Sequence, residues 1–245
     1  MSRRVRLALF LPALAGFAVL LGWALLDLPV FGHYQGPYGF ILNRVALPER
    51  HVTNVVTAIV FDYRGFDTMG EELILFASVT GVVLLLRVKE REARSGLNES
   101  IAIDAVRAAG VLAVGALALV GLWLVAFGFV TPGGGFQGGV ALASGVLMLY
   151  LASSYRSWSR VANPRVLEPF EGVGAGGYVV VGLAALVSGL PFLTNLIGTG
   201  DPGTLWSGGS AQFVNWAAGM EVAAANLLLF REFLEEYSVR IRGAT

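Results

Sequence analysis

The sequence contains several apolar runs long enough to cross a lipid bilayer, and these runs restrict its fold more than any other feature. A membrane-spanning helix needs about 20 mostly apolar residues, and it satisfies its own backbone hydrogen bonds in lipid. Only 14% of the residues are charged, against roughly 25% in soluble domains. We therefore predict an all-α, polytopic membrane protein with about six spans. The predicted spans are Leu7–Leu26, Leu73–Leu86 (which is short), Ala108–Val130, Phe136–Ala152, Val173–Leu193 and Phe213–Phe230.

The positions of lysine and arginine predict the orientation of these spans. Of the 17 basic residues, 14 fall in the N-terminal segment, in two of the connections and in the C-terminal tail. The other three, Arg44, Arg50 and Arg64, lie in the long connection between the first two spans. Because cytoplasmic loops carry an excess of Lys and Arg, both termini are predicted to be cytoplasmic, in a protein of the cell membrane.

The long connection is predicted to hold structure of its own. The segment His51–Phe61 is apolar but too short to cross the bilayer. We interpret it as an interfacial or partly inserted helix that leads into a charged turn on the outer side.

That charged turn, Asp62–Glu72, is named here the corner segment. Its ionisable residues are Asp62, Arg64, Asp67, Glu71 and Glu72. Thr68 and Glu71 have the spacing of a capping box, which is predicted to open the second span, and Arg64 can pair with either nearby aspartate. Composition alone favours a structural corner, and a site that handles ions is the alternative.

A second motif joins the third and fourth spans and is named here the glycine-rich turn. It consists of Thr131, Pro132, Gly133, Gly134, Gly135, Phe136, Gln137, Gly138 and Gly139. It lacks the lysine and hydroxyl residues of a phosphate-binding loop. A tight turn that lets the two spans pack closely is favoured. The alternative is contact of Gln137 and the free backbone amides with a partner or a permeant ion.

Glu221 lies midway along the sixth span, so it is predicted to sit near the bilayer midplane. A carboxylate at that depth costs about 2.5–3.5 kcal/mol. Its helical neighbours are all alanines, which predicts that Glu221 faces protein rather than lipid: Ala217, Ala218, Ala224 and Ala225. Two interpretations stay open, a protonatable group in an ion path and a neutral, hydrogen-bonded structural side chain.

Glu168 and Glu171 stand just before the fifth span at i, i+3 spacing. Carboxylates are stabilising at a helix N-terminus, so a structural role is favoured for both. As an alternative, they are candidates for an ion path, with Glu171 at its cytoplasmic end.

No motif of an enzyme is present. The chain has no cysteine and two histidines, too few for a thiolate or histidine-rich metal site. A Ser/His/Asp set, a zinc motif and a dinucleotide fingerprint are also missing. We predict no catalytic residue, no metal and no cofactor, and the formal net charge of zero gives no reason to expect a nucleic-acid partner.

The string TPGGGFQGG resembles the signature of the MnhB domain, a subunit of Mrp-type multisubunit sodium/proton antiporters that has relatives in membrane-bound hydrogenases. This resemblance covers about Asp104–Tyr237. The upstream string NVVTAIVFDYRGFDTMGEE is similar to a segment of the small hydrogenase subunit MbhE and to the C-terminal end of the large Mrp subunit. We therefore predict a two-span unit over residues 1–95 and a four-span unit over residues 96–245, with Arg87–Ser100 as the joint.

The resemblance implies an accessory subunit of a monovalent-cation (sodium)/proton antiporter, which contributes to an ion path and to assembly. Its partners would be the other membrane subunits, the lipid bilayer, and Na⁺ and H⁺ as transported ions. The glycine-rich turn would then pack against a neighbouring subunit. The alternatives are the ion-translocating module of a hydrogenase-like complex and a scaffold that conducts nothing.

Overall fold

The structure is a computed structural model that describes residues 3–26, 28, 36–86 and 103–243. The predicted joint, Arg87–Ser100, lies outside the described residues. The chain divides into two compact units, Met1–Ile41 and Leu42–Thr245, and all of the regular structure that is described is helical.

The first unit contains α1, Arg3–Leu26, and the start of α2, Pro37–Arg50. Helix α1 is 24 residues long, and no residue of its apolar window is buried. A helix that is apolar on every side matches a lipid environment, as predicted for the first span.

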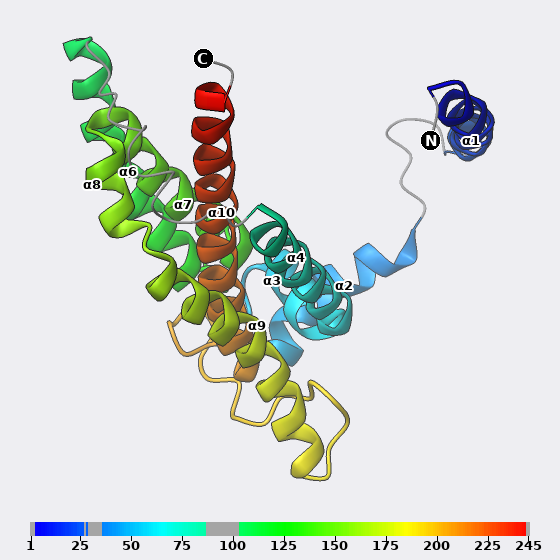
Figure 1. Ribbon diagram of the computed structural model, residues 1–245. Helices are drawn as coiled ribbons and strands as arrows, with labels where there is room; N and C mark the ends of the chain where they lie inside the picture. The colour runs from blue at the N-terminus through cyan, green and yellow to red at the C-terminus, as the bar shows by residue number, and fades with distance from the viewer. Residues whose placement is uncertain (1–2, 27, 29–35, 87–102, 244–245) are drawn as a thin grey trace. The chain divides into compact units, whose positions relative to one another are not determined.

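The second unit contains the remaining elements, and its long helices run side by side (Figure 1). Together with α1, five of these helices are long and apolar enough to cross a membrane, which confirms the prediction of six spans: α4, α6, α7, α9 and α10. The bounds are α3 Val55–Ala58, the π-helix η1 Ile59–Tyr63, α4 Gly65–Leu86, α6 Asp104–Ala126, α7 Gly135–Ala152, α8 Tyr155–Val161, α9 Pro164–Val187 and α10 Ser210–Gly243.

Helix α10 is the central helix of the second unit. It packs against α4, α7 and α9, whereas α6 packs mainly against α7. In the span window of α10, 61% of the residues are buried, against at most 33% in the other spans. The alanines around Glu221 form this packing surface, as the sequence predicted. Small residues let helix backbones approach closely in a membrane.

The glycine-rich turn is a packing device between α6, α7 and α10. A Cβ added at Gly138 would lie 2.8 Å from the carbonyl oxygen of Gly121 on α6. One added at Gly139 would lie 2.7 Å from the carbonyl oxygen of Gly219 on α10. Gly133 has a φ of 153°, which other residues rarely adopt. The prediction of a tight turn that packs neighbouring spans is therefore confirmed.

The second span starts earlier than predicted. Helix α4 begins at Gly65 rather than Leu73, because the backbone re-enters a helix directly after η1 with Asp67 in the first turn. The predicted capping box is wrong, since Thr68 lies inside α4 and its hydroxyl donates to the Val60 carbonyl at 2.7 Å.

Two other predicted boundaries also move. The helix predicted at His51–Phe61 begins at Val55, because His51 has a φ of 56° and Asn54 caps the first turn. The fifth span begins at Pro164 and ends at Val187, with Asn163 as its cap. Glu168 and Glu171 therefore lie inside α9 rather than at its start.

Connections gather at the two ends of the second unit. At one end, the Asn54 amide binds the α6–α7 turn, and the His51 ring contacts the Gly200 carbonyl. At the other end, the Tyr155 hydroxyl donates to Glu235 at 2.6 Å. This partition is the one that alternating spans require, and the orientation relative to the cytoplasm stays a prediction.

Candidate functional site

Glu221 is buried at the contact between α9 and α10. Its exposed fraction is 0%, as the sequence predicted. Gly174 makes the contact possible, because a Cβ there would lie 2.7 Å from both the backbone nitrogen and the Cβ of Glu221. The two helices therefore touch backbone to backbone beside the carboxyl group.

A second buried carboxyl group faces Glu221 from α4. Glu72 is 1% exposed, and its carboxyl group lies within hydrogen-bonding reach of that of Glu221. Among the residues that the structure describes, no other donor or cationic side chain contacts these four oxygens. Two ionised carboxylates can only accept hydrogen bonds, so this carboxyl pair needs a shared proton or a bound cation.

Glu171 extends this acidic cluster along α9. It is 4% exposed and interacts electrostatically with Glu221. The described residues contain no group of three or more acidic or histidine side chains that converges as metal ligands would. The three carboxyl groups therefore form a row from three helices rather than a cage.

Glu168, the other acidic candidate on α9, is exposed. The structure therefore leaves it outside the buried row, although it lies one turn from Glu171.

Glu72 is the site residue that the sequence interpretation missed. Starting the span at Leu73 placed this side chain at a helix entrance instead of in the core. The buried positions of α4 are Gly65, Thr68, Glu72 and Val79. Their spacing marks one face of a helix, and it becomes visible only when the helix is started at Gly65.

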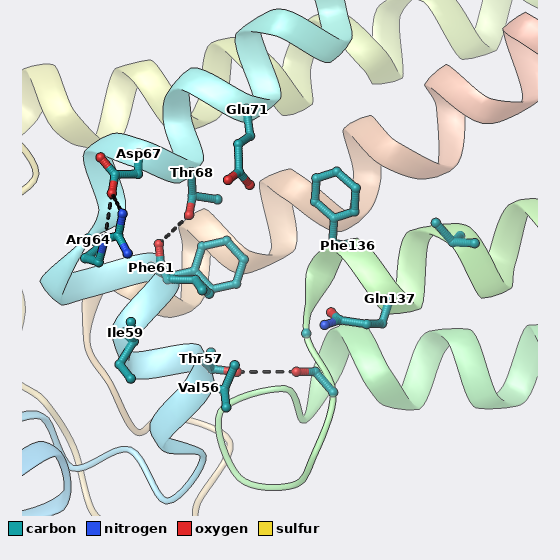
Figure 2. A pocket seen from close by; sticks show the side chains of 14 residues that line it. Val56, Thr57, Ile59, Phe61, Arg64, Asp67, Thr68, Glu71, Phe136 and Gln137 are labelled. Atoms are coloured by element: carbon teal, nitrogen blue, oxygen red, sulfur yellow. Dashed lines mark hydrogen bonds and ion pairs between the residues drawn. The ribbon is translucent and has the colours of Figure 1, made fainter. Parts of the chain in front are cut away.

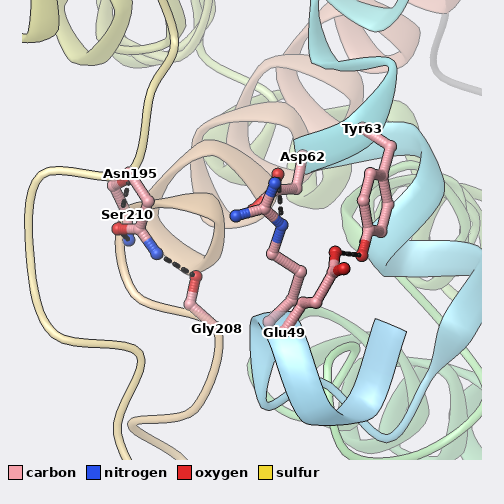
Figure 3. A network of polar contacts seen from close by, with 7 residues as sticks. Glu49, Asp62, Tyr63, Asn195, Gly208 and Ser210 are labelled. Carbon is pink, nitrogen blue, oxygen red and sulfur yellow. Dashed lines mark hydrogen bonds and ion pairs between the residues drawn. The ribbon is translucent and has the colours of Figure 1, made fainter. Parts of the chain in front are cut away.

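The first half of the corner segment carries a polar network against the end of α2 (Figure 3). Arg50 pairs with Asp62 at 3.1 Å, and its guanidinium lies 5.0 Å from the centre of the Tyr63 ring. The Tyr63 hydroxyl donates to Glu49 at 2.7 Å. Burial raises the pKa of Asp62, although Arg50 opposes this shift. Burial and the bond to Glu49 raise the pKa of Tyr63 to about 12.

Arg64, which the sequence allowed to pair with either aspartate, pairs with Asp67. Both side chains are more than half exposed, so the pair contributes little to stability. Because Asp62 is taken by Arg50, each aspartate of the corner segment has its own arginine.

The two sequence motifs meet in space. The Asn54 amide nitrogen donates to the carbonyl oxygens of Gly128 at 2.7 Å and Thr131 at 3.0 Å. The Thr57 hydroxyl also donates to Gly128, at 2.7 Å. Three backbone acceptors of the α6–α7 turn are thus bound by the segment that precedes the corner, because Asn54 also reaches Gly133.

A cavity of about 640 Å³ lies between the two motifs. Figure 2 shows the side chains of Glu71, Phe136 and Gln137 around it. Phe136 and Gln137 are exposed, whereas Gly135, Gly138 and Gly139 are buried against the chain's own helices. The buried glycines thus serve internal packing, and the exposed side chains of the turn line the cavity.

Comparison with known proteins agrees with this arrangement. A family model described as a domain related to the MnhB subunit of Na⁺/H⁺ antiporters matches residues 105–228. A second model, for the MbhE subunit of a membrane-bound hydrogenase type named MBH, matches residues 2–104. The family models thus meet between residues 104 and 105.

Two curated relatives share 28% identity with this chain. One is an uncharacterised protein of Methanocaldococcus jannaschii, for which the match covers 75% of this chain and 78% of the relative. The other is a probable K⁺/H⁺ antiporter A/B subunit of Rhizobium meliloti. That match covers 79% of this chain but only 21% of the longer protein.

Solved structures share the fold. A chain of the membrane-bound sulfane sulfur reductase, an archaeal respiratory membrane complex, has a TM-score of 0.68 and 28% identity over 94% of this chain and 98% of its own length. A chain of the Mrp complex from Dietzia sp. DQ12-45-1b has a TM-score of 0.66 and 22% identity. It covers 95% of this chain and 26% of its own length, and it shows the fold alone.

Both structural neighbours are parts of membrane complexes, and the spans of this chain match theirs in arrangement. The family model covers about half of the chain and includes the glycine-rich turn and Glu221. The chain therefore belongs to the family of domains related to the MnhB subunit of Na⁺/H⁺ antiporters, as a multi-pass membrane subunit of that type.

Proposed function

We propose that this chain is an accessory subunit of a multisubunit monovalent-cation/proton antiporter and that its carboxyl pair is part of the ion path. The observation that carries the proposal is the contact between Glu72 and Glu221. Two carboxyl groups from different helices face each other in the core, and no described cationic side chain neutralises them.

An uncompensated buried carboxylate is costly, so such a pair persists only when something neutralises it. A proton shared between the two oxygens does this, and so does a hard cation held by carboxylate oxygens. The same pair can therefore hold a proton or Na⁺ in turn, which is the chemistry that an exchanger of these ions requires.

Glu171 gives the path a direction. It lies one turn before Gly174 on α9, on the side of α8. In the predicted topology this is the cytoplasmic side. Glu171 is then the group that passes ions between the carboxyl pair and the cytoplasm.

The chain itself is proposed to catalyse no chemical reaction. The family consists of domains related to an antiporter subunit, and the sequence carries no nucleophile, metal or cofactor motif. In this proposal the remaining channels of the complex belong to its other membrane subunits.

The test is the neutral substitution Glu221→Gln in the whole complex, with antiport measured in inverted membrane vesicles. We expect antiport to fall at least about tenfold, with the variant co-purifying normally with its partner subunits. Asp104→Asn is the matched control, because Asp104 is an exposed acid at the start of α6. Normal assembly with unchanged antiport across pH would remove Glu221 from the mechanism and leave a scaffold that conducts nothing.

A second candidate is the ion-translocating module of a respiratory or hydrogenase-like complex. The match to the sulfane sulfur reductase chain over nearly its whole length supports it. Co-purifying redox subunits would favour this candidate, and co-purifying antiporter subunits alone would favour the first.

A further inference from the structure

A second cavity opens beside the polar network of the corner segment and is named here the corner pocket. Its volume is about 590 Å³. Charged side chains and the chain before α10 form its walls, which include Arg50, Asp62, Arg64, Gly65, Leu193 and Asn195. Because it holds two ion pairs, water and small ions can enter it readily.

Tyr178 of α9 stands directly behind one wall of this pocket. Its exposed fraction is 1%, and its hydroxyl donates to the Gly65 carbonyl at 2.8 Å. A Cβ added at Gly65 would lie 3.7 Å from this hydroxyl and 3.6 Å from Leu193. The missing side chain of Gly65 therefore leaves only the Leu193 side chain between the hydroxyl and the pocket.

Leu193 itself has an unusual backbone. Its φ is 62°, in the left-handed region that leucine rarely occupies. Such strain persists only where the surroundings hold it, and it is often found at sites that move or bind. The wall of the corner pocket next to Tyr178 is thus held in a conformation that costs energy.

On its other side, Tyr178 points toward the carboxyl pair. Its hydroxyl lies within hydrogen-bonding reach of the Thr68 hydroxyl. Thr68 precedes Glu72 by one turn on the same buried face of α4. Side chains at this spacing are about 5–6 Å apart, a gap that one water molecule can bridge.

We propose that the Tyr178 hydroxyl is the proton relay between the corner pocket and the Glu72–Glu221 pair. This inference rests on the proposed function of that pair. The hydroxyl oxygen accepts a proton from water in the pocket while its own O–H bond breaks toward Thr68. The Thr68 hydroxyl, through water, passes its proton to the Glu72 carboxylate. One proton enters and one leaves, so neither hydroxyl ends with a charge.

The first test is Tyr178→Phe in the whole complex, which removes only the hydroxyl. We expect the maximal rate of antiport to fall at least about tenfold, while the half-saturating Na⁺ concentration and the yield of assembled complex stay unchanged. Tyr155→Phe is the matched control, because it also removes a buried hydroxyl that donates a hydrogen bond, and it should keep the wild-type rate.

The second test narrows the passage. Gly65→Ala places a methyl group in ordinary contact with both Leu193 and the Tyr178 hydroxyl, so it obstructs the passage without a clash. We expect a lower maximal rate with normal assembly. Gly70→Ala, on the same helix, adds a methyl group with no neighbour within 4 Å and should have no effect.

The outcomes separate the two proposals. If Glu221→Gln abolishes antiport and Tyr178→Phe leaves its maximal rate unchanged, the relay is wrong and the carboxyl pair keeps its role. If Tyr178→Phe lowers the yield of complex in proportion to antiport, Tyr178 is only structural and the relay is again overturned. If neither substitution changes antiport, the proposed function itself fails.

Discussion

At the scale of single residues, Asn54 explains how the two sequence motifs become one structure. Its side-chain oxygen caps α3 by accepting from the Thr57 amide at 3.3 Å. Its amide nitrogen binds carbonyl oxygens of the α6–α7 turn. One side chain thus uses its acceptor locally and its donors on a segment more than 70 residues away.

Asn54→Asp separates these two uses, since aspartate caps a helix as well as asparagine does but donates nothing. We expect the complex to lose about 2–4 kcal/mol of stability, because buried carbonyl oxygens lose their donor and face a carboxylate. Thermal unfolding of the purified complex measures this loss. Asn163→Asp is the control, since Asn163 caps α9 through its oxygen; equal losses at both positions would contradict the role of the donor.

Residue patterns predicted part of the site. The burial of Glu221 followed from its four alanine neighbours, a local pattern that helix geometry translates directly into a packing face. The contact with Glu72 could not be predicted, because it depends on how α4 and α10 lie against each other. The bonds of Asn54 likewise join segments that are distant in sequence, and no local pattern encodes such a pair.

At the scale of helices, glycine and alanine set the distances between spans. Gly174 brings α9 onto α10 beside Glu221, and Gly139 brings α7 onto the opposite side of the same helix. The number of spans was predictable, since it follows from hydrophobic length. The starts of α4 and α9 were not, because polar residues near a helix entrance fit inside a helix as well as before it.

Gly139→Ala tests this packing. The added methyl group would lie 2.7 Å from the Gly219 carbonyl oxygen and 2.9 Å from the Val222 side chain, so α7 and α10 must move apart. We expect a loss of about 1–3 kcal/mol, seen as a lower thermal midpoint and a lower yield of assembled complex. Gly172→Ala, which adds a methyl group with no neighbour within 4 Å, should behave as wild type. A wild-type midpoint for Gly139→Ala would show that this contact is not tightly packed.

At the scale of the whole molecule, the two family segments build one unit. The family models meet between residues 104 and 105, yet α4 from the first segment packs against α10 from the second. The carboxyl pair takes Glu72 from one segment and Glu221 from the other. The proposed ion path therefore exists only when both segments are present, which gives a physical reason for them to share a chain.

The central claim is that Glu72 and Glu221 act as one ion-binding unit, and a double-mutant cycle tests it most directly. Antiport by the purified, reconstituted complex is measured for Glu72→Gln, for Glu221→Gln and for the double variant. Residues that work as a unit give strongly non-additive losses. We predict that each single substitution lowers antiport at least about tenfold and that the double variant is no worse than the more impaired single one. Losses that multiply in the double variant, or wild-type antiport in both assembled single variants, would contradict this account.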